Sequence, residues 1–509
     1  MIKNFKWLLL VSLTFAACSD DEEGTVVEEP ITAGSADFTK YVALGNSLTS
    51  GFSDNALFKA GQENSYPNIM SQQFALVGGG AFTIPFMDGN DGGLLLGGTP
   101  IQGKRLFLNG FLNASTPNIT PISGLPTTEV TTRLTGPFNN MGVPGAKSFH
   151  LLAPGYGNAA GILTGQANPY YVRFASSNTS TMLGDAVAQS PTFFSLWIGN
   201  NDVLSYASSG GIGVNQLGNM NPATYGGNDI TDPTVFASVY SALLDGLTAN
   251  GAKGVVANIP YVTSIPFFRT VPTNPVPLDA ATATSLNTQL LGPLRQILTA
   301  LGQGDRLVGV SAAANNPLLI KDESLTDLSA QLTGALIGAG ISAPQAGLMG
   351  SLYGQARHAK AGDLVLLTTR AIIGTSQAGI PPGLNTIGVT YPLQDSAVLT
   401  ATEAGEIKVA VDAYNASIKA LAEAKGLAFV DANATLQQVF STGVRFGNNH
   451  LSASFITGGV FSLDGVHPGA RGYAFIANKF LEAINAKYGS NFKGANLGDY
   501  QIQYPQTLN

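Results

Sequence analysis

The sequence predicts an α/β protein with a central parallel sheet and helices on both faces. One observation is a set of apolar, strand-like runs that pass into Gly, Asn or Asp, at residues 41–47, 190–202, 254–262 and 427–432. A second is that amphipathic segments follow or separate these runs. Residues 233–253 place Phe236, Val239, Leu243 and Leu247 at helical spacing, and residues 402–426 form another amphipathic segment. Strands that alternate with helices are typical of βαβ units.

The 509 residues suit one enlarged domain or two or three ordinary ones. We expect one domain with insertions, which spans residues 37–490. The Gly/Asn/Pro-rich residues 53–135 and the helical residues 265–400 interrupt the α/β pattern, so we expect insertions there. Residues 265–400 are predicted to form either a lid over an apolar pocket or helices packed permanently beside the sheet. Residues 491–509 are typical of an extended tail.

The first 17 residues have the pattern of a secretory signal peptide. Basic residues precede an apolar run from Trp7 to Ala17, which is shorter than the roughly 20 residues that span a bilayer. Small residues lead to Cys18, the single cysteine of the chain. Phe-Ala-Ala-Cys at 15–18 resembles the lipobox of bacterial lipoproteins, although Leu is usual in place of Phe15. The alternative is a plain secretory peptide with a chance cysteine.

The acidic stretch after Cys18 resembles the export signal of surface-exposed lipoproteins of the Bacteroidetes type. We therefore expect cleavage after residue 17, lipidation of Cys18, and an acidic flexible tether at residues 18–36. Two or more acyl chains would anchor the protein stably in the outer membrane, at the cell surface. Nothing later in the sequence resembles a membrane span.

Charge and cysteine content exclude several classes of function. Charged residues make up 11% of the chain, the net charge is −7, and no basic patch is visible, so we expect no nucleic-acid partner. One cysteine allows neither an intrachain disulfide nor a cysteine metal site. No cluster of metal-ligating residues is visible, and we expect no metal, no cofactor and a monomeric chain.

Two stretches near the N-terminus place useful groups at predicted strand ends. Ser47 in Gly-Asn-Ser-Leu lies on a turn from strand to helix, where its hydroxyl would be exposed near a helix N-terminus. Taken alone, Ser47 is more often a helix N-cap. Residues 140–145, Asn-Met-Gly-Val-Pro-Gly, predict a tight turn that exposes backbone N–H groups, or simply a Gly/Pro turn.

Two further stretches supply an amide and a histidine. Asn201 in "GNND" carries the kind of amide donor that stabilises an oxyanion, although a turn whose Asn and Asp satisfy their own backbone is the simpler interpretation. Asp464 and His467 lie three residues apart in "DGVHP", before a predicted helix. The carboxylate could hold one imidazole nitrogen and leave the other facing a site. Taken alone, this turn more often starts a helix than forms a dyad.

Together and in this order, the four stretches resemble the conserved blocks of the SGNH hydrolases, also called the GDSL family of esterases and lipases. The resemblance covers roughly residues 38–262 and 400–485. It implies a three-layer α/β/α, flavodoxin-like fold with a mostly parallel sheet. It also implies Ser47 as nucleophile, His467 as base, Asp464 as acid, and an oxyanion hole formed by Ser47, Gly145 and Asn201.

The chain departs from the family pattern at two places. Asn46 stands where the family usually has Asp, a position outside the catalytic group. Pro144 and Ala146 flank Gly145, where Ser and an acidic or polar residue are commoner. Pro144 has no N–H, but the donor that the resemblance implies belongs to Gly145.

The resemblance implies a serine ester hydrolase that works through an acyl-enzyme. Lipid, short acyl and acetylated-sugar esters are all substrates within the family. The Gly-rich loops at 78–98 and the apolar insertion favour a mainly apolar acyl pocket, and therefore a lipase or esterase over a carbohydrate O-deacetylase. The alternative from another class is a non-catalytic surface lipoprotein that binds glycan or lipid. Two Trp are few for a sugar-stacking surface.

Overall fold

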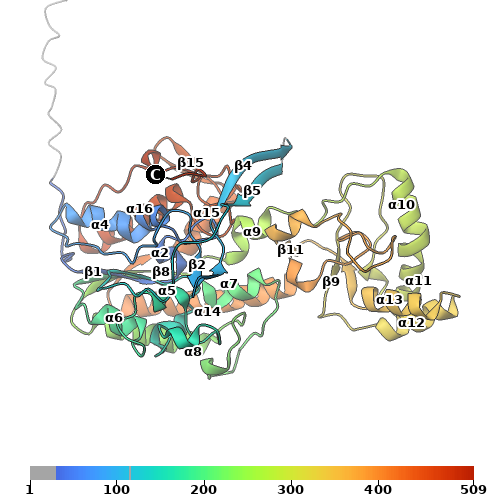
Figure 1. Ribbon diagram of the computed structural model, residues 1–509, viewed down its shortest axis with the longest axis horizontal. Helices are drawn as coiled ribbons and strands as arrows, with labels where there is room; N and C mark the ends of the chain where they lie inside the picture. Colours follow the sequence, from blue (N-terminus) through green and yellow to red (C-terminus); the bar gives the residue numbers. More distant parts are fainter. Residues whose placement is uncertain (1–29, 114–115, 509) are drawn as a thin grey trace, which may run out of the picture.

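The computed structural model describes residues 30–113 and 116–508 (Figure 1). The predicted signal peptide, Cys18 and most of the acidic tether lie outside the described residues. Within the described part of the chain, no helix has the length and hydropathy needed to cross a membrane.

A five-stranded sheet forms the centre of the protein, with the strand order β13-β8-β7-β1-β6. Every pairing in this sheet is parallel. All residues of β1 and β7 are buried, as expected for strands covered on both faces. The predicted α/β class with a parallel sheet is confirmed. The strands are β1 (Tyr41–Gly45), β6 (Asn140–Gly142), β7 (Phe193–Trp197), β8 (Lys253–Ala257) and β13 (Ala428–Val430).

Helices cover both faces of this sheet (Figure 1). One face carries α4 (Tyr66–Ala75) and α16 (Ala470–Tyr488), which pack against each other through the stacked rings of Tyr66 and Phe480. The other face carries α6 (Met182–Val187), α8 (Pro233–Thr248) and α14 (Ala401–Ala424). Helices α8 and α14 occupy the two segments whose apolar spacing predicts helices.

Residues 265–400 contribute no strand to the central sheet, and most of them extend to one side of it (Figure 1). They bury two apolar clusters of their own and the ion pairs of Arg357 with Asp322 and Asp363, each 2.6 Å long. The segment therefore packs around its own centre. Its elements include α9 (Pro266–Arg269), α10 (Ala280–Leu286), α11 (Gly292–Ala300), β9 (Leu319–Lys321), α12 (Ser329–Gly338), α13 (Ala343–Tyr353), β10 (Ala356–His358), β11 (Leu364–Val365) and β12 (Val398–Leu399).

The stretch 53–135 contains α4, which covers one face of the sheet, and otherwise forms short helices and strands outside the sheet. These are α3 (Lys59–Glu63) and the antiparallel pairs β2 (Leu94–Leu96) with β3 (Thr99–Gln102) and β4 (Leu106–Asn113) with β5 (Thr116–Pro121). The buried Arg105 guanidinium donates to the carbonyls of Pro505 and Gln506 at 2.7 and 3.0 Å. The C-terminal segment is thereby held against this stretch.

The carboxyl ends of β1, β6 and β7 meet at one edge of the sheet because these strands are adjacent and parallel. At this edge β1 continues into α2 (Ser47–Ser50), and β7 leads within a few residues to α7 (Asn201–Ser208). Ligands of open α/β sheets bind at such an edge.

Gly45, the last residue of β1, is required by close packing at this edge. A Cβ at this position would lie 2.1 Å from Thr49 Oγ1 and 2.5 Å from the Trp197 carbonyl oxygen. We predict that Gly45→Ala lowers the free energy of unfolding by about 1–3 kcal/mol, as overpacking does. Urea denaturation measures this. The control is Gly103→Ala, whose Cβ meets nothing within 4 Å. Equal stabilities of the two variants would contradict the prediction.

Candidate active site

The candidate nucleophile is held at the start of α2. Asn46 is the cap of this helix, because its Oδ1 accepts the Leu48 N–H at 3.0 Å. The interpretation of Ser47 as the N-cap is therefore wrong. Ser47 is the first helical residue, and its Oγ lies 2.9 Å from His467 Nε2. The cap leaves the hydroxyl free to contact the imidazole.

Asp464 holds the other nitrogen of the same imidazole. His467 Nδ1 lies 2.9 Å from Asp464 Oδ2, and Asp464 Oδ1 accepts the backbone N–H groups of Val466 and His467 at 2.8 Å. Burial raises the pKa of Asp464, but the His467 charge and these hydrogen bonds outweigh burial and hold the pKa below its usual value. Asp464 is therefore ionised at neutral pH and fixes the orientation of His467.

Gly145 and Asn201 lie on neighbouring segments of the same edge. The turn that carries Gly145 begins beside β1, where the Val143 N–H donates to the Gly45 carbonyl at 3.0 Å. Gly145 has a φ of +81°, a conformation that favours glycine. Asn201 is the first residue of α7, and its Nδ2 donates to the Ala146 carbonyl at 2.9 Å. This bond fixes the Asn201 amide next to the Gly145 turn.

Two backbone donors at this edge have no protein acceptor. Within the described chain, neither the Ser47 N–H nor the Gly145 N–H donates a hydrogen bond to another residue. Asn201 Nδ2 carries a second hydrogen besides the one given to Ala146. These donors are of the kind that stabilises a developing oxyanion.

Asp202 has a role that sequence reasoning missed. Instead of satisfying its own turn, its buried carboxylate accepts the backbone N–H and the hydroxyl of Ser148 at 2.8 and 2.6 Å. Burial raises the pKa of Asp202 despite these bonds. Asn168 supports the same region, because its Nδ2 donates to the Pro144 carbonyl at 2.8 Å. The sequence signal was an acid at the start of the helix that follows the apolar strand β7, but its partner Ser148 lies 54 residues away in the chain.

An apolar pocket with a volume of about 110 Å³ opens beside Ser47 and His467. It lies where the carboxyl ends of β7 and β13 meet α15 (Ala432–Ser441) and α16. Polar side chains line it at few positions, which include Ser47, Asn201 and His467. Most of its lining is apolar and includes Trp197, Leu204, Val430, Leu436, Val439 and Phe475.

This pocket is formed mainly by the core of the protein. None of residues 78–98 lines it, and Ile265 is its one lining residue from the segment 265–400. The expectation that these two segments supply the apolar pocket is wrong for this pocket. The physical reason is that α15 and α16 turn apolar side chains at three- and four-residue spacing toward the sheet edge.

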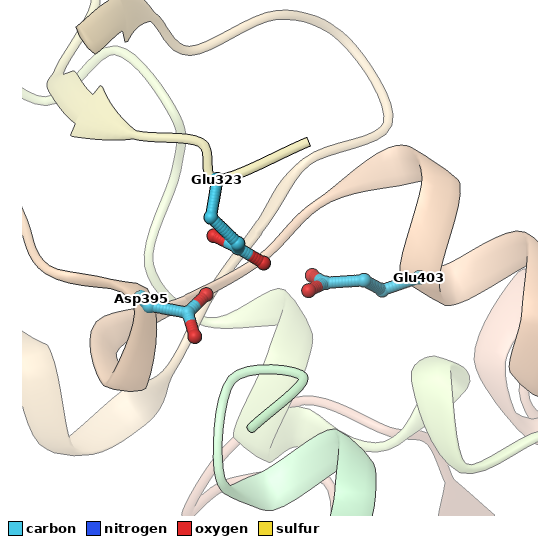
Figure 2. A group of neighbouring side chains, drawn as sticks. All are labelled: Glu323, Asp395 and Glu403. Carbon is cyan, nitrogen blue, oxygen red and sulfur yellow. The ribbon is translucent and has the colours of Figure 1, made fainter. Parts of the chain in front are cut away.

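A separate acidic group lies where the segment 265–400 joins α14 (Figure 2). Among the described residues, Glu323, Asp395 and Glu403 bring carboxylate oxygens within 4.8 Å of one another, close enough to share a cation. Burial, followed by neighbouring carboxylates, raises the pKa of Asp395 to about 7. Burial also raises the pKa of Glu403 to about 7, against hydrogen bonds from Thr400. None of the three lines the pocket beside Ser47.

Two other histidines, His150 and His358, accept hydrogen bonds from backbone N–H groups. His150 Nδ1 accepts the Lys147 N–H at 3.0 Å, and His358 Nδ1 accepts the Val308 N–H at 2.9 Å. Both are strongly buried, and burial, followed by a nearby cation, lowers the pKa of each to about 4. Both are neutral at physiological pH and hold turns in place.

Comparison of the chain with family models, curated proteins and solved structures found no match. The hydrogen-bonded series Ser47–His467–Asp464, the two N–H groups without protein acceptors and the adjoining pocket are the observations that any function must explain.

Asn46 provides a test of how the nucleophile is held. Its Nδ2 donates to Asn200 Oδ1 at 3.0 Å while its Oδ1 caps α2. In Asn46→Asp the acceptor for Leu48 remains, and Asn200 can turn its amide to donate to the new carboxylate. We predict that Asn46→Asp changes the free energy of unfolding by less than about 1 kcal/mol. Asn46→Ala leaves two buried polar groups without partners and should cost about 1–3 kcal/mol. Equal losses in urea denaturation would contradict this assignment.

Proposed function

We propose that the protein is a serine ester hydrolase with Ser47, His467 and Asp464 as its catalytic triad. The observation that carries the proposal is one imidazole bonded on both sides, 2.9 Å from the Ser47 hydroxyl and 2.9 Å from the Asp464 carboxylate. Ser47 and His467 are 420 residues apart in the chain, so local turn geometry does not explain their contact. Nucleophile, base and orienting carboxylate in this order define a triad on any fold.

In the proposed mechanism His467 Nε2 removes the proton of Ser47 as Oγ attacks the ester carbonyl carbon. The Ser47 N–H, the Gly145 N–H and the Asn201 amide stabilise the oxyanion of the tetrahedral intermediate. His467 then gives its proton to the leaving alcohol, which leaves an acyl-enzyme on Ser47. Water, deprotonated by His467, attacks the acyl-enzyme and releases the acid. Asp464 stays ionised throughout and stabilises the imidazolium.

We assign the chain to the SGNH hydrolases, with the three-layer, flavodoxin-like form of the α/β fold. Support comes from the positions of the four sequence stretches. The stretch with Ser47 follows β1, the stretch with Gly145 runs from β6 into its turn, and the stretch with Asn201 runs from β7 into α7. The stretch with His467 precedes α16. All four meet at one edge of the parallel sheet, between helices on both faces (Figure 1).

The proposed substrate is an ester with an apolar acyl chain. The pocket that begins at Ser47 is lined mostly by apolar side chains, with a few polar groups at the end that holds Ser47 and His467. Such a lining is typical of a site that binds an apolar ligand. A longer acyl chain would contact more of this apolar lining than an acetyl group does, which favours lipid or short-to-medium acyl esters over acetylated glycans.

The proposed location is the outer surface of a bacterial outer membrane, with the protein anchored as a monomer through lipidated Cys18. This part of the proposal rests on the lipobox-like residues 15–18 and the acidic residues after them. Labelling of cells with a radioactive fatty acid, with Cys18→Ser as control, would test it.

Loss of the nucleophile tests the proposed reaction. We predict that Ser47→Ala abolishes ester hydrolysis, because no group remains to form the acyl-enzyme. Asn201→Ala should lower turnover by about 10²–10³, the cost of one oxyanion donor, with a smaller effect on KM. Steady-state kinetics on nitrophenyl esters measure both. Normal turnover by Ser47→Ala would refute the proposal and favour a non-catalytic binding protein.

Acyl-chain length tests the proposed substrate. We predict that kcat/KM rises by about fourfold per added methylene until the pocket is filled, since each buried methylene contributes about 0.8 kcal/mol. Val439→Phe should reduce activity on long chains and leave activity on acetyl esters within about threefold. The control is Val409→Phe, at an exposed position outside the pocket. Activity confined to an acetylated polysaccharide would instead support the O-deacetylase alternative.

A further inference from the structure

Residues Ser53, Asp54 and Asn55 form a strained turn shortly after α2. Asp54 has a φ of 50° and Asn55 a φ of 64°, so two successive residues other than glycine adopt the left-handed conformation. Asp and Asn tolerate this conformation better than other residues with side chains, but it still costs free energy. Contacts with the rest of the protein must therefore hold the turn in place.

The turn is bonded to the loop that carries Asp464 and His467. Segments some 410 residues apart in the sequence are joined here by four hydrogen bonds. They run from Ser53 Oγ to the Pro468 carbonyl (2.9 Å), from the Asp54 N–H to Ser462 Oγ (3.0 Å), from the Leu463 N–H to Asp54 Oδ1 (2.9 Å), and from the Asn55 N–H to Asp464 Oδ2 (2.9 Å).

One of these bonds reaches the catalytic carboxylate itself. The Asn55 N–H donates to Asp464 Oδ2, the same oxygen that lies 2.9 Å from His467 Nδ1. Ser462 Oγ donates to the other oxygen, Oδ1, at 3.0 Å, and the Asp54 N–H in turn donates to Ser462 Oγ. The turn therefore holds both oxygens of Asp464. It bonds directly to Oδ2, which faces the imidazole, and reaches Oδ1 through Ser462.

The Asp54 side chain is buried, with 1% of its surface exposed, and its Oδ2 has no hydrogen-bond partner. Burial, together with the nearby Asp464 charge, raises the pKa of Asp54 to about 7, although Leu463 and Arg105 act in the opposite direction. Asp54 thus resists ionisation beside a carboxylate that is held ionised. The other oxygen of Asp54, Oδ1, accepts the Leu463 N–H at 2.9 Å.

We propose that Asp54 and Asn55 are positioning residues that align the catalytic carboxylate of Asp464 with His467. The proposal rests on the proposed function, because it assigns a task within the same triad. Neither residue touches the substrate pocket. When the turn is displaced, Asp464 loses a hydrogen bond on its imidazole-facing oxygen, His467 is oriented less well, and the chemical step slows while substrate binding is retained.

Paired variants test this proposal. Asn55→Gly keeps the N–H and adopts a positive φ without strain, whereas Asn55→Val disfavours that φ because of its β-branch. Asp54→Asn keeps the acceptor for Leu463, whereas Asp54→Ala removes it. We expect Asn55→Gly and Asp54→Asn to keep kcat within about threefold. Asn55→Val and Asp54→Ala should both displace the turn, so that the ionised Asp464 loses the hydrogen bond from the Asn55 N–H. Loss of a hydrogen bond to a charged group should lower kcat by about 10- to 100-fold, with KM changed less than about threefold.

Different results would overturn the positioning proposal and the proposed function. An inactive wild-type protein would overturn the proposed function. The Nδ1–H proton resonance of His467, assigned with Asp464→Asn, would still test the positioning role, because it reports the Asp464–His467 bond without turnover. A resonance that shifts in Asn55→Val but stays in place in Asn55→Gly supports the proposal.

Folding of the variants is checked by thermal melting, and kinetics are measured well below each midpoint. Should Asn55→Val fail to fold, Asn55→Ala provides a milder strain at the same exposed position. Variants that melt earlier but keep the wild-type kcat and the wild-type proton resonance would show a purely structural turn, and would overturn the positioning proposal.

Discussion

The contact between His467 and Ser47 is the constraint on which the site depends, because it joins residues 420 positions apart. A parallel sheet can bring such distant residues together, because the carboxyl ends of its adjacent strands meet at one edge. β1 delivers Ser47 there, β6 and β7 deliver Gly145 and Asn201, and α16 on one face of the sheet follows directly after the His467 loop (Figure 1). The segment 265–400 packs around clusters of its own, so its presence in the chain need not disturb this edge.

The buried carboxyl groups near the site differ in the direction in which their pKa is shifted. Asp464 receives hydrogen bonds from backbone groups, Ser462 and His467, and these keep its pKa low despite burial. Asp54 lies close by with fewer bonds, and its pKa rises to about 7. Asp202 is also buried, and its pKa is raised although it accepts two hydrogen bonds from Ser148. Of these three carboxyl groups, Asp464 is the one whose pKa is lowered, because the His467 charge and its hydrogen bonds together outweigh burial.

The sequence was sufficient to predict the parallel sheet, because buried strands and amphipathic helices leave strong periodic patterns. It also singled out Ser47, Gly145, Asn201, Asp464 and His467, which the structure places at one edge. It did not distinguish Asn46 from Ser47 as the helix cap, because both residue types cap helices. It missed the partners of Asp202 and Asp54, which are distant in the chain. It also attributed the apolar pocket to the loops at 78–98 and the insertion at 265–400 rather than to α15 and α16. Long-range pairing has no local sequence signal.

The most direct test of the triad is the rate at which a fluorophosphonate modifies the intact protein, followed by mass spectrometry and peptide mapping. The proposed triad predicts one adduct, on Ser47, because His467 would activate this hydroxyl among all the serines of the chain. It also predicts that His467→Ala and Asp464→Asn slow the modification strongly without changing its position. A wild-type protein that stays unmodified, or one modified at Ser47 equally fast without His467, would contradict the account.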